Sequence, residues 1–300
     1  MNMKKIKLTM IALVAMVISV SAWTRQQTAE QDGRTKQLEE QTARQPNNAQ
    51  LFQRLGQSYF YQARNGNAQA LEKAIAAFER AAALAPADAA QARWLGVSYF
   101  LKAAFLFRSQ AGSKEVVADL DRTVTAFNRA LERAPDDPFL LSAHGSALTV
   151  LSGFKQSQDL LRKGVEEMNR AVNSDPKSIH ARLFRGFTHL NLPPMFRDPK
   201  VAAEDLNAIL KAMPAEYNQQ AEGVMRILLG DVYSETKDVA RAKAEYESAA
   251  KLSSSAADEA RARLLALGQG QPDARAIRQY RANVINCAIC HSQPAAVSAK

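Results

Sequence analysis

The chain of 300 residues is poor in cysteine, and only two residues separate its two cysteines, Cys287 and Cys290. It also lacks clusters of β-branched residues bounded by glycine. Alanine, leucine, glutamine, arginine and glutamate dominate instead. Because these residues favour helix and the usual strand signals are missing, the composition predicts an all-α fold.

Sequence motifs of several functional classes are also missing. There is no Gly-rich phosphate loop, no His-Glu-x-x-His and no Gly-x-Ser-x-Gly. No lysine and arginine run is interleaved with aromatic residues, so the net charge of +9 does not indicate a nucleic-acid-binding protein. The acidic pairs Asp136-Asp137 and Glu166-Glu167 are adjacent in sequence and point in different directions, which suits solvated helix-start charges rather than a general acid and base. We therefore expect a protein that is not an enzyme.

The two cysteines and the residue after them, His291, match Cys-x-x-Cys-His, the attachment signature of c-type haem. Each thiol forms a thioether with a haem vinyl group, and the histidine is then placed to ligate the iron. We expect one covalent haem c on Cys287 and Cys290, with His291 as an axial iron ligand. An unmodified tail, a disulfide or a redox pair are the alternatives. The βαβ context of a thioredoxin is missing, which weakens the redox alternative.

Residues 1–22 have the pattern of a secretory signal peptide. Three lysines among the first seven residues precede an apolar run over residues 8–20, and small residues lead to Ala22. The run is shorter than the roughly 20 residues of a membrane span. We expect cleavage after Ala22 and a periplasmic protein, with an uncleaved membrane anchor as the alternative. Export suits the motif, since bacterial c-type haem is attached outside the cytoplasmic membrane.

One sequence pattern recurs five times over residues 41–267. In its first copy, Gly56 and Tyr59 are followed by Phe78 and Pro86. The glycines of the five copies are Gly56, Gly96, Gly145, Gly186 and Gly230. The closing positions are Pro86, Pro135, Pro176, Pro214 and Ser254. The pattern resembles that of the tetratricopeptide repeat.

This resemblance implies a right-handed α-solenoid of about five helix pairs. Glycine and alanine let the two helices of a pair approach, and proline ends the second helix. No repeat buries its apolar face alone, so the array is the stable unit. We expect a linker or leading helix over residues 23–40, the solenoid over 41–267 and a tail over 268–300. The last helix of the solenoid should cap the array, with Arg261 and Arg263 facing water.

Two copies carry extra residues between their helices. These lie within Phe105–Leu120 in the second copy and in the proline-rich segment Leu192–Pro199 in the fourth. They predict either longer helices with looser turns, or an edge that contacts a partner or covers the haem.

The concave face is the usual binding surface of such solenoids, and the first helix of each repeat lines it. The pattern places on this face Gln53, Gln57, Phe60, Arg93, Val97, Phe100, Ser142, His180, Leu183, Phe187, Ile227 and Asp231. The set mixes apolar rings with few charges and lacks the lysine and arginine clamp that holds a terminal carboxylate in some family members. An extended or helical peptide held by apolar contacts is the expected ligand.

The haem motif follows an expected short helix that has Ile277 and Tyr280 on one face and arginines 275, 278 and 281 on another. The position of the haem motif near the end of the chain resembles that in class II cytochromes c. This resemblance covers only the tail. Few residues follow the motif, so we expect the solenoid or a second subunit to cover the haem, or the haem to stay exposed. The arginines would steer an acidic redox partner.

The sequence does not identify the sixth ligand of the iron. His180 is a candidate because of its groove position, and Met195 because it lies in the proline-rich segment. His144 and His189 are expected in the helix–helix core, and a five-coordinate iron would suit gas binding. The expected function is an exported scaffold that docks a protein partner and transfers single electrons. A non-redox adaptor or assembly factor, for example in cytochrome maturation or envelope-complex assembly, and a haem-based sensor are the alternatives.

Overall fold

The structure is a computed structural model that describes residues 31–63, 67–109, 111–213, 219–252, 255–270, 277, 280 and 281. The expected signal peptide and the motif at 287–291 lie outside these residues. Within them, all regular structure is helical and no strand is present. The chain divides into two compact units, Met1–Pro86 and Ala87–Lys300, called the first and second unit below. None of the described helices combines the length and apolar character of a membrane span.

The first unit contains a helix over residues 31–44, α2 (Ala49–Ala63) and α3 (Ala68–Leu84). Gly56 of α2 lies directly against the Phe78 ring of α3: a Cβ there would come within 2.6 Å of it. The hydroxyl of Tyr59 donates a hydrogen bond to the carboxylate of Glu39, which ties the leading helix to α2. Burial, and then this carboxylate, raise the pKa of Tyr59 to about 12.

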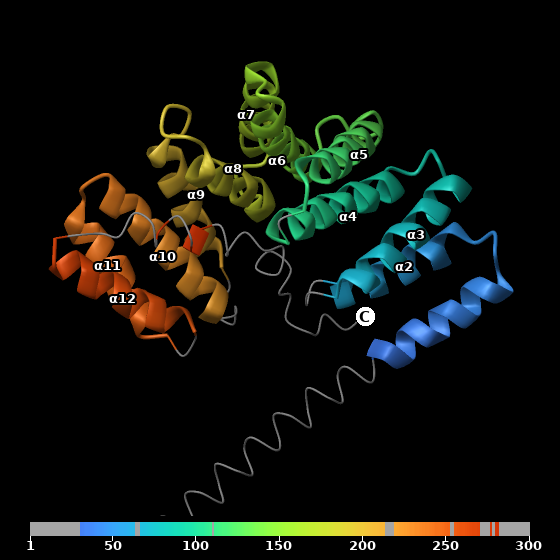
Figure 1. The fold of residues 1–300 in the computed structure, drawn as a ribbon, viewed down its shortest axis with the longest axis horizontal. Coiled ribbons are helices and arrows are strands. Elements are labelled where there is room, and N and C mark those ends of the chain that lie inside the picture. The colour runs from blue at the N-terminus through green and yellow to red at the C-terminus, as the bar shows by residue number, and fades with distance from the viewer. Residues whose placement is uncertain are drawn as a thin grey trace, which may run out of the picture. The chain divides into compact units, whose positions relative to one another are not determined.

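The second unit is a series of helix pairs closed by a single helix (Figure 1). The pairs are α4 (Ala89–Arg108) with α5 (Ser113–Leu131), α6 (Pro138–Lys155) with α7 (Gln158–Ser174), α8 (Ile179–Asn191) with α9 (Pro199–Ala212), and α10 (Gln219–Glu235) with α11 (Val239–Ala250), followed by α12 (Ala256–Gly268). With α2 and α3, the described residues hold the five helix pairs and capping helix that the repeats predict.

The repeat glycines lie where paired helices come closest. A Cβ on Gly96 would lie 2.6 Å from the Phe127 ring, and one on Gly230 would lie 2.5 Å from the Tyr246 ring. In the third pair, a Cβ on Gly145 would lie 2.5 Å from the backbone oxygen of Gly164. These distances are shorter than van der Waals contact, so glycine is needed for the helices to pack at this separation.

The turns between repeats end one helix and begin the next. α7 ends at Ser174, just before Pro176, and the hydroxyl of Ser178 accepts a hydrogen bond from the backbone N–H of Ala181 in α8. Asp137 caps α6 in the same way after Pro135. An N-cap side chain satisfies a backbone donor that the helix leaves unpaired, so these turns fix the helix starts.

The extra residues of the second and fourth repeats take different forms. In the second repeat they lengthen the helices, since α4 reaches Arg108 and α5 begins at Ser113. In the fourth repeat they form a loop between α8 and α9 in which Met195 is 81% exposed. Longer helices therefore explain the first insertion.

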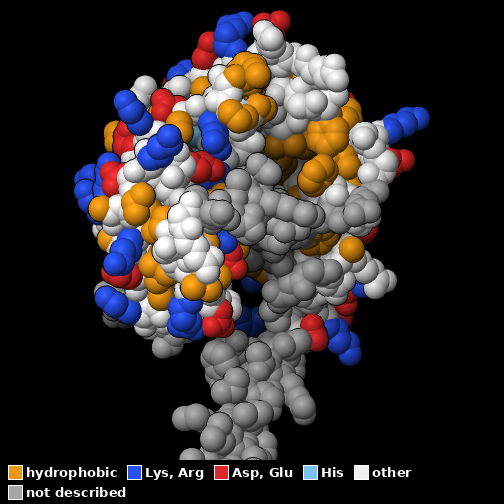
Figure 2. Space-filling model, turned by 60° about the vertical axis from the view of Figure 1, so that its left-hand side comes forward, with side chains coloured by type: hydrophobic (Ala, Val, Ile, Leu, Met, Phe, Trp, Pro, Cys, Tyr) orange, Lys and Arg blue, Asp and Glu red, His pale blue; other side chains and the backbone are white. Residues whose placement is uncertain are grey.

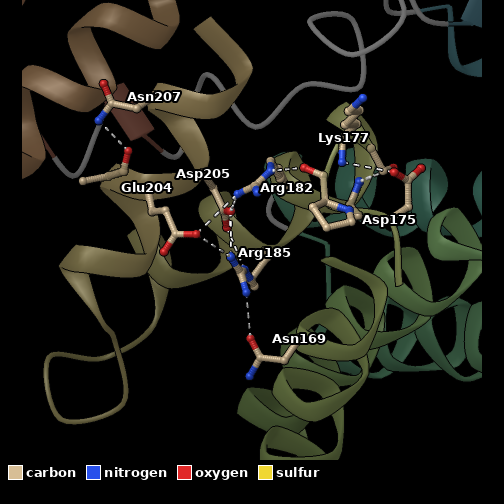
Figure 3. A network of polar contacts seen from close by, with 12 residues as sticks. Asn169, Asp175, Lys177, Arg182, Arg185, Glu204, Asp205 and Asn207 are labelled. Carbon is tan, nitrogen blue, oxygen red and sulfur yellow. Dashed lines mark hydrogen bonds and ion pairs between the residues drawn. The ribbon is translucent and has the colours of Figure 1, made fainter. Parts of the chain in front are cut away.

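Buried ion pairs join helices within the second unit. In Figure 3, Arg182 and Arg185 of α8 converge on the carboxylate of Asp205 in α9, and Arg185 also donates to Asn169 of α7. The capping helix differs from the sequence expectation in one residue. Arg261 is exposed, but Arg263 is buried because it pairs at 3.0 Å with Asp231 of α10.

Candidate functional site

The second unit contains an apolar groove with a volume of about 500 Å³. It lies along α8 and is bounded by α4, Phe127 of α5, α6, the start of α7 and the α8–α9 loop. Six phenylalanines contribute to its wall: Phe100, Phe127, Phe139, Phe184, Phe187 and Phe196. Hydrophobic side chains also gather around a hollow in the face of the protein seen in Figure 2. This volume falls in the range of small-molecule and cofactor sites.

The groove wall carries no formal charge in the described part of the chain, because no Asp, Glu, Lys or Arg lines it. Serine, threonine, asparagine and glutamine side chains supply its polar atoms, and His180 is its one titratable group among the described lining residues. An apolar or aromatic ligand is therefore the class that this surface accommodates.

His180 is half-buried near the first turn of α8. Its ring lies edge-on to that of Phe139, with 5.6 Å between ring centroids, and the guanidinium of Arg93 lies 3.9 Å from the Phe139 centroid. Burial, and then the charge of Arg93, lower the pKa of His180. This shift favours the neutral imidazole, the form in which a ring nitrogen can act as a ligand.

Five of the residues placed on the binding face by the repeat pattern line this groove: Val97, Phe100, His180, Leu183 and Phe187. Gln53 and Gln57 are half-buried in α2, within the first unit. Arg93 is half-buried in α4 and lies over Phe139. These two glutamines and Arg93 are not part of the groove wall.

The other four residues expected on the binding face are instead buried: Phe60, Ser142, Ile227 and Asp231. Phe60 is 1% exposed in the first unit, and Ile227 and Asp231 are fully buried in α10. Ile227 and Asp231 are buried because α9, α11 and α12 all pack against α10. Asp231 accepts a hydrogen bond from the Tyr246 hydroxyl at 2.8 Å and pairs with Arg263, so it stabilises the end of the array rather than a groove.

The other histidines and Met195 are placed as follows. His144 is buried with its Nδ1 atom 2.6 Å from the Glu167 carboxylate, and His189 is buried and accepts a hydrogen bond from the Asp198 backbone N–H. Both therefore lie in the helix–helix core, as expected. Met195 is exposed on its loop and does not line the groove. The described residues contain no group of three or more His, Cys, Asp or Glu that could hold a metal ion.

The described chain ends with a fixed contact that the sequence did not predict. Ile277 is buried, and Tyr280 packs against the core around α10. Arg281 is 2% exposed: its Nη1 donates to the backbone oxygen of Leu190 at 3.3 Å and pairs with Glu235 at 2.9 Å. Arg281 is therefore not available to steer an acidic partner, contrary to expectation; arginines 275 and 278 lie outside the described residues.

Comparisons with known proteins identify the repeat. Residues 225–255 match the tetratricopeptide-repeat family model. A thermophilic tetratricopeptide-repeat protein of Thermus thermophilus is similar in structure, with a TM-score of 0.50 and 16% identity over 74% of this chain and 100% of that chain. No curated protein matches the sequence.

Two further solved structures are more distant. YrrB, described as a tetratricopeptide-repeat protein with an unusual peptide-binding site, has a TM-score of 0.43 and 14% identity over 78% of this chain and 96% of that chain. Yeast Tom70 has a TM-score of 0.49 and 16% identity over 82% of this chain and 45% of that chain.

The repeat match and the successive helix pairs show that this chain contains a tetratricopeptide repeat and has the α-solenoid fold of tetratricopeptide-repeat proteins. The sequence prediction of the fold is therefore confirmed.

Proposed function

We propose that this protein is an exported interaction scaffold that carries one covalent c-type haem and exchanges single electrons with a protein partner. The observation that carries the proposal is the apolar groove, because it offers a haem-bearing chain an uncharged wall of aromatic rings. The covalent haem itself is inferred from Cys287, Cys290 and His291. When bound, the haem would supply one-electron chemistry.

Two further features of the chain support this proposal. Export is inferred from the signal-like pattern of residues 1–22, and it would place the thiols where bacterial c-type haem is attached. The interaction role is supported by the solenoid fold, since stacked repeats create extended surfaces that partners use.

The test is the visible spectrum of the full chain, produced in a bacterium that attaches c-type haem. We expect a c-type α-band in the reduced protein, which survives acid–acetone extraction because the haem is covalently bound. A Cys287→Ala, Cys290→Ala double variant should lose this band while its helical circular dichroism stays the same. A colourless wild-type protein with free thiols by mass spectrometry would reject the haem.

A non-redox adaptor is the second candidate, and a specific observation favours it. The groove is apolar and elongated along one helix, which also suits the apolar face of a partner helix. In that case His291→Ala should leave both partner capture and the cellular task unchanged, whatever it does to the redox behaviour of the tail. A haem-based sensor would instead bind carbon monoxide in the reduced wild-type protein.

A further inference from the structure

We propose that the apolar groove along α8 is the pocket for the haem carried by Cys287 and Cys290, with His180 as the second axial ligand of its iron. This inference rests on the proposed function, because it requires a haem on the tail. It assigns the groove to a segment of this chain rather than to a partner.

The end of the described chain lies beside the groove. Arg281 is held at the backbone oxygen of Leu190, in the last turn of α8. Asn191 and Leu192, the next two residues, line the groove. The pairing of Arg281 with Glu235 fixes this position further, and both contacts are largely buried. The residue from which the tail continues is therefore anchored at one end of the groove.

The haem motif can reach the groove from this anchor. Cys287 follows Arg281 by six positions, and an extended chain spans about 3.3–3.6 Å per residue, so the thiol can lie roughly 20 Å from the anchor. His180 precedes Leu190 by ten positions in α8, which corresponds to about 15 Å of helix. The tether is long enough to place a haem against His180.

The groove wall matches the chemistry of a porphyrin. Phe139, Phe184 and Phe187 offer flat apolar surfaces, and no described lining side chain would leave an unpaired charge beneath the macrocycle. The two propionates of a haem need cations at the edge of such a site. Arg93 provides one, since its guanidinium lies over the Phe139 ring beside His180.

Among the candidate ligands, His180 is the one whose position suits the iron. His144 and His189 are buried between paired helices, and neither lines the groove. Met195 is outside the groove wall. His180 lies in that wall, half-buried among aromatic rings. The iron would then have two histidine ligands, His180 and His291.

The test compares three haem-bearing full-length proteins: wild type, His180→Ala and Met195→Ala. In the reduced wild type we expect a low-spin spectrum that carbon monoxide does not change, because both axial positions are filled. In His180→Ala, carbon monoxide should bind immediately, and added imidazole should restore the low-spin spectrum. Met195→Ala is the matched control and should behave as wild type.

The outcomes separate this inference from the proposed function. A haem that stays low-spin in His180→Ala, or that changes in Met195→Ala, overturns the inference, leaves the haem proposal standing and frees the groove for a partner peptide. No covalent haem in any of the proteins rejects the proposed function itself. If His180→Ala does not fold, the electron paramagnetic resonance spectrum of the ferric wild type decides: a bis-histidine signal supports the inference, and a high-spin or histidine–methionine signal overturns it.

Discussion

Arg185 and Asp205 form a two-pronged ion pair between α8 and α9, with both nitrogen–oxygen distances at 2.8 Å (Figure 3). Arg182 donates to the same carboxylate, also at 2.8 Å. The side chain of Asp205 is fully buried. In this repeat the glycine, Gly186, meets the Cβ of Asp205 rather than an aromatic ring. One carboxylate therefore holds α9 against α8, the helix along which the groove lies.

Replacing Asp205 by asparagine should lower the free energy of unfolding by about 3–5 kcal/mol, because two largely buried guanidinium groups lose their buried anion and keep only longer contacts to exposed Glu204. Asp121→Asn is the control, since its pair with Lys155 is half-exposed and should contribute about 0–1 kcal/mol. Urea unfolding measures both. Equal losses for the two variants would show that Asp205 does not hold α8 and α9 together.

Replacing Gly230 by alanine should destabilise the protein by about 1–3 kcal/mol, because the new methyl group would meet the Tyr246 ring. Gly153→Ala is a matched control in another helix. Nothing lies within 4 Å of a Cβ there, so alanine should stabilise α6 by about 0.5–1 kcal/mol. Thermal unfolding should show shifts of opposite sign. A Gly230→Ala protein as stable as wild type would mean that α10 and α11 can separate freely.

Tyr59 should make stability fall at alkaline pH. Its pKa is raised to about 12 in the folded protein, above the ordinary value of 10.0. The folded state therefore binds this proton more tightly than the unfolded state, so the contribution is complete below pH 10 and is lost as the pH rises toward 12. Ultraviolet titration should show a late tyrosinate step near pH 12 that Tyr59→Phe removes, below the steps of Tyr246 and Tyr280, whose pKa values burial raises further. The same late step in the variant would contradict the assignment.

Phe187→Asp should weaken binding of an apolar fluorescent probe to the full chain produced without haem by about tenfold or more, because it places a charge in the groove wall. Phe107→Asp is the control: that ring is 63% exposed on α4 and lies outside the groove. Fluorescence titration measures both. Equal loss of binding in the two variants would show that the probe does not report on the groove.

The repeat pattern predicted the part of the fold that depends on close helix packing. Gly56 and Phe78 are a recognisable pair because glycine is needed opposite a large ring, and the same kind of pair recurs at Gly96 and Gly230. The prolines predicted where helices end. The pattern also placed His180, Leu183 and Phe187 on the wall of the groove, since all three lie on the first helix of a repeat.

What the pattern could not predict depends on contacts that are specific to one repeat. Asp231 occupies a position that would be open in the middle of an array, but at its end α12 covers it and supplies Arg263 as a counterion. No local spacing signals that pair, which joins residues 32 positions apart. Arg281 and Leu190 are 91 positions apart, and no pattern in the sequence predicts their contact either.

The pairing of Arg263 with Asp231 also limits how the end of the array can open. Separation of α12 from α10 would break this buried ion pair and the packing around it, so fraying at this end of the array is disfavoured. Amide hydrogens of α12 should consequently exchange with deuterium nearly as slowly as those of α10. The capping helix α12 is therefore expected to unfold together with α10 rather than before it.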